Sequence, residues 1–416
     1  MPHRTATIRD WFERLGPGLM LAAAAVGVSH LVFATQAGAT YGLSFVWLIV
    51  LISILKYPAF CFAVDYASLT NRSLVHAYAD LGRIALAWLF VGLAVDIFIA
   101  TTAVALVTAG LFISVFDLSW SGPQVAIVLC FATAVILING QYRKAERIVK
   151  TLVAGFSVLV VSATISALPE VGSDGRGVFG DVSPNPDGFA LGIAMAGWMP
   201  MPITGAIFIS MWAREKKASC SLDIEHHAAR HDLAFGWLLT IGLAICFTIM
   251  GAAILFETSR EAPASAGAFA SELLPLLTTV VGHWSYPLIA IAAIAVMWSG
   301  VFALMDVVPR VTGRLVDHAR GREDQPSPYW FWLGVQFAGV ALILLFLMGN
   351  FGTFVAFATS AGFITAPALA YYNYRAATSK DVARHYSPSR SLLIWHWIGF
   401  ASLAIFAIAF VINQVR

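Results

Sequence analysis

The sequence predicts an all-α integral membrane protein with eleven transmembrane helices. Of its 416 residues, 59% are hydrophobic and only 12% are charged, and the mean hydropathy is +0.79. Soluble domains carry roughly 25% charged residues, so a water-exposed surface does not fit this composition. Apolar runs of about 20 residues, the length of a spanning helix, recur between short polar stretches. We therefore expect the lipid bilayer to be the solvent of this chain.

The spans follow from the apolar runs between charged clusters. They cover residues 17–38, 43–66, 86–114, 123–140, 149–168, 187–212, 232–256, 285–310, 329–348, 352–373 and 392–413. The first run is expected to be a retained helix, because no clear small-residue cleavage site follows it. Segment 264–283 contains Glu272 and Pro275. Counting it as a span would break the charge alternation, so it is predicted to be an interfacial helix on the outer surface.

The orientation follows from the distribution of basic residues. With a cytoplasmic N-terminus, 21 of the 25 Lys and Arg residues fall on the cytoplasmic side. They are Arg4, Arg9, Arg14, Arg72, Arg83, Arg143, Lys144, Arg147, Lys150, Arg214, Lys216, Lys217, Arg230, Arg310, Arg314, Arg320, Arg322, Arg375, Lys380, Arg384 and Arg390. The positive-inside rule thus predicts an inside N-terminus and an outside C-terminus, in a bacterial inner (plasma) membrane.

Nucleic acid is excluded as a partner. The net charge is only +2, and the basic residues are spread over many loops instead of forming a patch. Three of the four cysteines lie in apolar spans and the fourth lies in a basic loop, so disulfides are not expected. No nucleophile elbow, phosphate loop or zinc-protease motif is present, so an enzyme is the least favoured class, and no cofactor is predicted.

An inverted repeat is indicated by the first and sixth spans. Gly18 and Gly27 open the first span with the same spacing that separates Gly188 and Gly197 in the sixth. Many transporters consist of two such halves whose first helices are broken at the binding site. The predicted organisation is a first five-helix repeat in 1–168, an outer loop in 169–186, a second, inverted repeat in 187–373, and a cytoplasmic loop with one extra helix in 374–416.

Both of these spans carry features of a broken helix. Pro200 and Pro202 each remove a backbone donor, which at membrane depth is tolerated where protein or a cavity satisfies the freed carbonyls. The first span places Gly27, Ser29 and His30 at mid-membrane, where an imidazole is costly without a partner. A simple proline kink and a structurally satisfied histidine remain the alternatives to a binding site.

Several segments resemble one known family along the whole chain. They are Leu-Gly-Pro-Gly at 15–18, Ala-Gly-Ala-Thr-Tyr-Gly at 37–42, Met199-Pro200 and Pro367. Together they resemble the natural resistance-associated macrophage protein (Nramp) family, which is similar in fold to LeuT. The resemblance implies a 5+5 inverted repeat with discontinuous helices 1 and 6, and a secondary transporter that couples uptake of divalent transition metals to protons.

The family's first-helix motif, Asp-Pro-Gly-Asn, corresponds to residues 27–30 of this chain. Gly27 and His30 therefore stand where the family carries its metal-binding Asp and Asn. In the sixth span, Ala196 and Met199 match the Ala and Met of the family's metal site. Met201 stands where the family carries a His.

Two further family positions differ. Thr365 replaces a glutamine that precedes Pro367, and the acidic proton-relay pair of helix 3 has no counterpart, Asp96 being the nearest carboxylate. The resemblance thus implies a substrate site formed by Gly27, Ser29, His30, Ala196, Met199, Met201 and Thr365.

The chemistry of this predicted site leaves two substrate classes open. A hard divalent cation needs a carboxylate or several carbonyl oxygens, and the predicted site offers no carboxylate. A metal substrate would therefore be a soft or borderline one held by His30 and Met199, with backbone carbonyls. The positive N-termini of half-helices also accept anions, so a small anion or a polar organic solute is the alternative. A channel or a receptor is the third class. The oligomeric state, the direction of transport and proton coupling stay open.

Two charged groups in neighbouring spans are candidates to pair. Lys56 and Asp96 lie at similar predicted depth in the second and third spans, where they could form a coupling or structural ion pair. A lysine that extends its ammonium toward the interface is the alternative. His227 and His231 could hold a metal if they lie on a helix, but a solvated loop is favoured for them.

Overall fold

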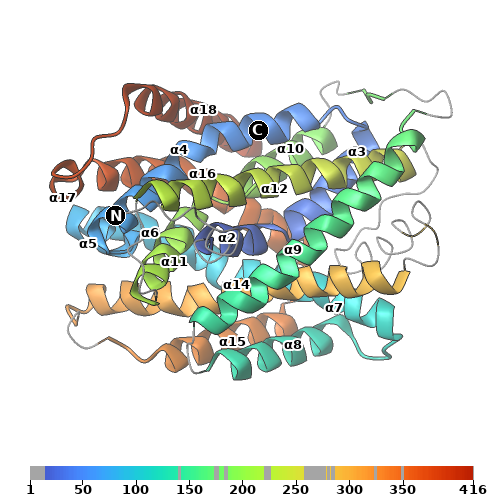
Figure 1. The fold of residues 1–416 in the computed structure, drawn as a ribbon, viewed down its shortest axis with the longest axis horizontal. Helices are drawn as coiled ribbons and strands as arrows, with labels where there is room; N and C mark the ends of the chain where they lie inside the picture. Colours follow the sequence, from blue (N-terminus) through green and yellow to red (C-terminus); the bar gives the residue numbers. More distant parts are fainter. Residues whose placement is uncertain are drawn as a thin grey trace, which may run out of the picture.

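The computed structural model describes residues 15–138, 142–172, 178–181, 186–219, 226–256, 278, 282, 286–322, 326–347 and 351–415. Its elements are helical, and the longer ones lie side by side in a bundle (Figure 1). In chain order they are α2 (Pro17–Ala25), η1 (Ser29–Ala34), α3 (Thr35–Tyr41), α4 (Val46–Thr70), α5 (Leu74–Leu81), α6 (Arg83–Val95), η2 (Asp96–Ala100), α7 (Thr101–Phe116), α8 (Gly122–Leu137), α9 (Tyr142–Ala167), η3 (Leu168–Glu170), α10 (Pro186–Trp198), α11 (Gly205–Ser219), α12 (His226–Leu255), α14 (Tyr286–Ala319), α15 (Tyr329–Phe346), α16 (Phe351–Ala377), α17 (Lys380–Ala383) and α18 (Arg390–Val415).

The predicted spans fall on these helices. Within the described residues, seven helices are long and apolar enough to cross a bilayer, and α2 with the following Ser29–Tyr41 helix forms an eighth candidate, bent by 57°. The remaining three predicted spans fall on α8, on α10 with α11, and on α16. The structure is compatible with eleven spans, and both spans expected to be discontinuous are broken.

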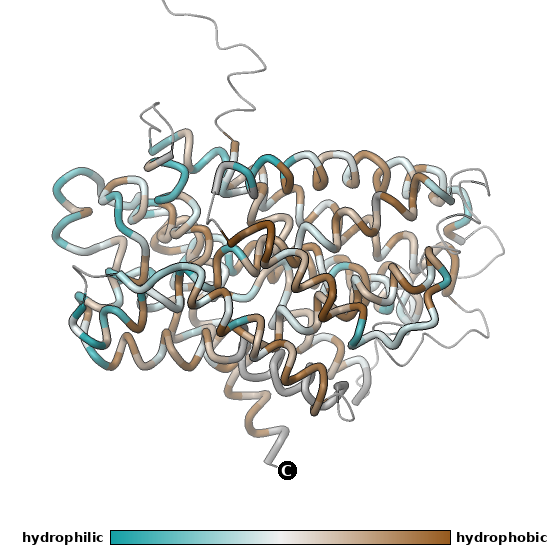
Figure 2. Tube along the Cα trace, turned by 90° about the horizontal axis from the view of Figure 1, so that it is seen from below, coloured by the Kyte–Doolittle hydropathy of each residue, from teal (hydrophilic) through white to brown (hydrophobic). Residues whose placement is uncertain are grey.

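The ends and the middle of the bundle differ in polarity. Apolar residues dominate along the helices, and hydrophilic residues gather at the end that holds α5 and α17 (Figures 1 and 2). At the other end, residues 178–181 pair with the chain after α3: the Leu43 N–H donates to the Val178 carbonyl, and the Gly180 N–H to the Tyr41 carbonyl. Part of the predicted outer loop therefore covers the end of the first span.

The first span packs on α12 through glycines. A β-carbon on Gly18 would lie 2.0 Å from the Asp232 carbonyl oxygen, and one on Gly236 would lie 2.1 Å from the Gly18 carbonyl oxygen. Further along, Gly38 and Gly251 approach the backbone of the opposite helix equally closely. Small residues let membrane helices meet backbone to backbone, so these glycines fix the position of the broken first span.

Prolines inside two helices free carbonyls that aromatic side chains satisfy. Pro58 in α4 cannot donate to the Ile54 carbonyl, which instead accepts from the indole N–H of Trp395 at 2.8 Å. Pro309 in α14 likewise leaves the Met305 carbonyl to the Tyr329 hydroxyl, at 3.4 Å. Donors from neighbouring helices thus keep these kinked spans satisfied in the bilayer.

Some expectations fall outside the described residues or differ from the structure. The predicted interfacial helix at 264–283 lies outside them, apart from residues 278 and 282. His227 and His231 lie on the first turns of α12 instead of in a loop, and both are exposed. The loop expectation for this pair was wrong because α12 begins six residues, nearly two turns, before its apolar run.

Candidate functional site

The first span breaks at Val26–Gly27. α2 ends at Ala25, Val26 leaves the helical conformation with ψ 83°, and a π-helix starts at Ser29. A β-carbon on Gly27 would lie 3.2 Å from a methyl group of Val104 in α7, so α7 packs closely against the break and a larger residue there would require Val104 to shift slightly. The break therefore sits where the sequence placed it, at the start of residues 27–30.

The sixth span breaks at Met199–Thr204. α10 ends at Trp198 and α11 begins at Gly205, whose N–H donates to the Pro202 carbonyl. Pro200 and Pro202 lie inside the break and have no N–H to continue the helix. Carbonyl groups in and before this segment therefore need partners from elsewhere in the protein.

Lys56 supplies three of those partners. Its ammonium, on α4, donates to the carbonyl oxygens of Gly197 at 3.0 Å, Met199 at 2.8 Å and Met201 at 3.2 Å. The residue is 1% exposed. All three ammonium hydrogens are thus directed to the broken backbone. Asp96 begins η2, but its side chain lies outside the described residues, so its pairing with Lys56 stays a prediction.

A small cavity lies between the two breaks. Its volume is about 40 Å³. It is lined by Ala24, Ala25, Gly27, Val28, Ser29, Ala100, Val104, Trp198, Met201, Pro202, Phe208 and Leu304. None of the lining residues that the structure describes is a carboxylate. Space on this scale holds one ion or a few water molecules, and its polar side-chain atoms come from Ser29 and the Trp198 indole.

The predicted site residues divide into two groups. Gly27, Ser29 and Met201 line the cavity. Ala196, Met199 and Thr365 are not in its lining: Met199 is fully buried, and the Thr365 hydroxyl donates to the Gly362 carbonyl of its own helix at 3.1 Å.

His30 is also absent from the cavity lining. One ring nitrogen, Nε2, lies 3.1 Å from the Thr240 carbonyl of α12 and therefore donates to it. The other, Nδ1, lies 2.9 Å from the Ser29 hydroxyl, which is also 3.3 Å from the Ala25 carbonyl. Both nitrogens already have partners, so in this conformation the imidazole links the first span to α12.

A second charged group holds the other end of the broken first span. The carboxylate of Asp232, 4% exposed on α12, accepts from the N–H of Gly16 at 2.9 Å and of Gly18 at 2.7 Å. An anion at a helix N-terminus satisfies free N–H groups and opposes the positive end of the helix dipole. Sequence reasoning missed this contact, because the partners are more than 200 residues apart and α12 was expected to begin at Asp232 itself.

Ion pairs link the helices at the same end of the bundle. Glu146 of α9 accepts from Lys216 of α11 at 2.5 Å and pairs with Lys150 at 2.6 Å. Asp65 of α4 receives two hydrogen bonds from the Arg230 guanidinium, at 2.6 and 2.7 Å. These pairs tie both the discontinuous sixth span and α12 to the rest of the bundle.

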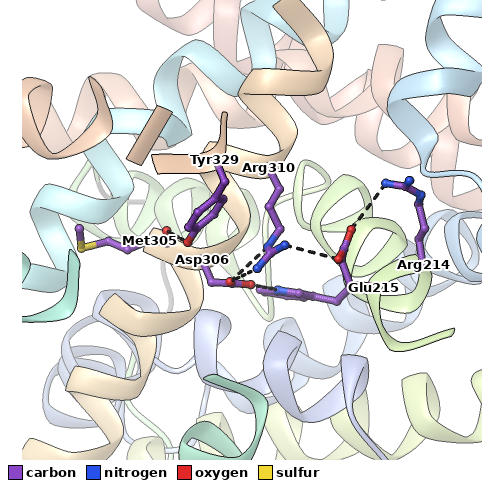
Figure 3. A network of polar contacts seen from close by, with 7 residues as sticks. Arg214, Glu215, Met305, Asp306, Arg310 and Tyr329 are labelled. Carbon is purple, nitrogen blue, oxygen red and sulfur yellow. Dashed lines mark hydrogen bonds and ion pairs between the residues drawn. The ribbon is translucent and has the colours of Figure 1, made fainter. Parts of the chain in front are cut away.

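A third network joins α11 to α14, as Figure 3 shows. Asp306 lies between the Arg310 guanidinium, at 2.8 Å, and the Trp212 indole N–H, at 3.3 Å. Arg310 also reaches Glu215 at 3.4 Å and lies over the ring of Tyr329. The second half of the sixth span, α11, is therefore held by charge pairs, whereas the break before it is held by Lys56.

Comparison with known proteins identifies the family. The model of the family described as "natural resistance-associated macrophage protein-like" matches residues 18–413. The chain belongs to the Nramp family. This Nramp family member is 29% identical to an uncharacterized protein of Pasteurella multocida (strain Pm70), over 98% of this chain and 94% of that protein. Nramp proteins are transporters, so the expectation that the chain is not an enzyme is confirmed.

Solved structures show the same fold. A manganese transporter of Eremococcus coleocola matches with a TM-score of 0.77 at 13% identity, covering 100% of this chain and 89% of that one. MhsT in complex with L-phenylalanine matches with a TM-score of 0.67 at 16% identity, covering 96% and 97%. The expected LeuT-like fold is thereby confirmed for this Nramp protein.

Proposed function

We propose that this Nramp protein is a secondary-active transporter that carries a soft or borderline divalent metal ion by alternating access, coupled to protons. The observation that carries the proposal is the cavity between the two helix breaks, because discontinuous helices at mid-membrane are the usual substrate site of this architecture. The family and the fold of a manganese transporter add support. We place the N-terminus in the cytoplasm, the C-terminus outside, and the protein in a bacterial inner membrane.

The donor set supports a soft ion. Met201 and Ser29 line the cavity, and His30 and Met199 lie beside the same breaks. Thioether and imidazole ligands prefer soft or borderline metals, whereas Mg²⁺ and Ca²⁺ require oxygen ligands. In the proposed cycle His30 exchanges its contact with Thr240 for the ion when the first span moves relative to α12.

The test is uptake by the purified protein in proteoliposomes. Cd²⁺ and Mn²⁺ should enter saturably and bring protons with them, and Mg²⁺ should not. Met201→Ala and Met199→Ala should lower Cd²⁺ uptake more than Mn²⁺ uptake, and His30→Ala should abolish both. Met250→Leu, at a buried α12 methionine outside the cavity lining, is the control and should leave uptake unchanged. The metal proposal fails if the intact protein neither binds nor moves Cd²⁺ and Mn²⁺.

One observation favours a second candidate substrate, a small anion or a polar solute. The Lys56 ammonium lies at the sixth-span break, and none of the described residues that line the cavity carries a carboxylate to offset its charge. A positive group near the cavity repels cations and attracts anions. Saturable uptake of an anion in the same vesicles, lost in His30→Ala, would establish this candidate in place of the metal.

A further inference from the structure

The contacts of Lys56 are those of a cation in a cage of carbonyl oxygens. Its ammonium donates to three neutral backbone oxygens, at 2.8 to 3.2 Å. They come from alternate residues of one short stretch, Gly197, Met199 and Met201, which converge on one point because the helix is broken there. Rings of backbone carbonyls are how proteins replace the hydration shell of a monovalent cation.

The electrostatics of the break also favour a positive charge. The stretch begins in the last turn of α10 and runs beyond its C-terminal end, where the helix dipole contributes a partial negative charge and the last carbonyls lack helical partners. A lysine chain from α4, a separate helix, reaches this point and ends in an ammonium with three donors. A cation both satisfies these carbonyl oxygens and is attracted by the negative end of the α10 dipole.

We propose that the carbonyls of Gly197, Met199 and Met201 form a monovalent-cation site that Lys56 fills with a tethered ammonium. The protein then needs no free Na⁺ or K⁺ at this break, and a transported cation gains these three oxygens only when the ammonium withdraws. The release of the oxygens to a transported cation rests on the proposed function. The cation site itself does not, so the site and the proposed function can fail separately.

The test removes the Lys56 ammonium by mutation and supplies a small cation from solution in its place. Lys56→Ala removes a chain that ends in the ammonium and leaves a space matched by n-propylammonium, whereas 1-propanol has similar size and no charge. The thermal unfolding midpoint of the detergent-purified variant should fall by several degrees relative to the unsubstituted protein. Millimolar n-propylammonium should raise it saturably, and 1-propanol should not. Na⁺ or K⁺ in place of choline should also raise it.

Two controls isolate the cage. The unsubstituted protein should show no response to n-propylammonium or to the exchange of Na⁺ for choline, because its site is already full. Lys217→Ala removes a lysine whose ammonium donates to the Ser68 carbonyl, away from the sixth-span break, so it should show no rescue either. A midpoint of Lys56→Ala that none of these cations raises would overturn the proposal.

A second variant covers the case in which Lys56→Ala does not fold. Lys56→Gln keeps two N–H donors for the carbonyls but carries no charge. If the site requires a cation, this variant should be clearly less stable than the unsubstituted protein, or should fail to yield monodisperse protein. If Lys56→Gln is as stable as the unsubstituted protein, the carbonyls need only hydrogen bonds and the cation site is refuted. None of these measurements requires transport, so they stand even if no metal moves.

Discussion

At the scale of single residues, opposite charges hold the break of the sixth span and the start of the broken first span. The Lys56 ammonium meets the carbonyls at the C-terminal end of α10, and the Asp232 carboxylate meets the N–H groups at the start of α2. The helix dipole makes the first end negative and the second positive, so each charge stabilises the end it contacts. A broken span therefore depends on buried charges from other spans.

Asp232→Asn should destabilise the protein measurably. The amide has one accepting oxygen, and its NH₂ group would face an N–H of Gly16 or Gly18, so one charge-assisted hydrogen bond is lost. Such a bond contributes about 1.5–3 kcal/mol, and the thermal unfolding midpoint should fall. Asp80→Asn is the control, because the Asp80–Arg72 pair is exposed and such pairs contribute about 0–1 kcal/mol. Equal effects of the two substitutions would contradict the anchoring role of Asp232.

At this scale the sequence predicted the breaks but not what holds them. Pro200, Pro202 and Gly27 act on their own backbone, so the local sequence is enough to predict their effect. The contacts of Lys56 and Asp232 join residues 141 to 216 positions apart, and no local pattern encodes which distant backbone a buried charge will meet. The partner of His30 was missed for the same reason, since Thr240 offers only its carbonyl.

At the scale of helices, the position of the first span depends on its contact with α12. Backbone atoms of the two meet at Gly251, where a β-carbon would lie 2.2 Å from the Thr35 carbonyl oxygen. Gly242, on the same helix, has open space at that point. The two glycines thus differ in packing while sharing the helix, which separates steric from conformational effects.

Gly251→Ala and Gly242→Ala should change stability in opposite directions. Alanine favours a helix over glycine by about 1 kcal/mol, so Gly242→Ala should raise the thermal unfolding midpoint. At Gly251 the added methyl group forces the helices apart, and overpacking costs about 1–3 kcal/mol, so the midpoint should fall. Unfolding followed by tryptophan fluorescence in detergent would measure both. If Gly251→Ala were more stable than the unsubstituted protein, the first span could move away from α12 at little energetic cost.

At the scale of the whole molecule, the fold was more predictable than the site. Hydrophobic length and proline position depend on the bilayer and on local backbone chemistry, so the span positions and both discontinuous helices could be anticipated. The cavity depends on how four spans meet: Ala100, Val104 and Leu304 line it, and nothing in their own sequence distinguishes them from other apolar residues. The predicted site residues consequently include residues of the two broken spans, but none of the α7 and α14 residues that also line the cavity.

The orientation in the membrane is the remaining global prediction. Residues 178–181 pair with the chain after α3, at the end of the bundle opposite α5 and α17 (Figure 1). The end with α5 and α17 is the hydrophilic one (Figure 2), and it carries the basic residues Arg72, Lys380 and Arg384. Because positive charge is retained in the cytoplasm, this end should face inward.

Two single cysteines in a background without the native four would test it. Phe179, which is 71% exposed, and Ala218, which is exposed at the end of α11, should lie on opposite sides of the membrane. In intact cells an impermeant thiol reagent should label Phe179→Cys, and it should label Ala218→Cys only after permeabilisation, because the reagent cannot cross the bilayer. Labelling of Ala218→Cys from outside, with Phe179→Cys protected, would show that the topology is the inverse of the predicted one. The Asp232 contact with the first span would then lie at the outer end of the bundle instead of the inner one.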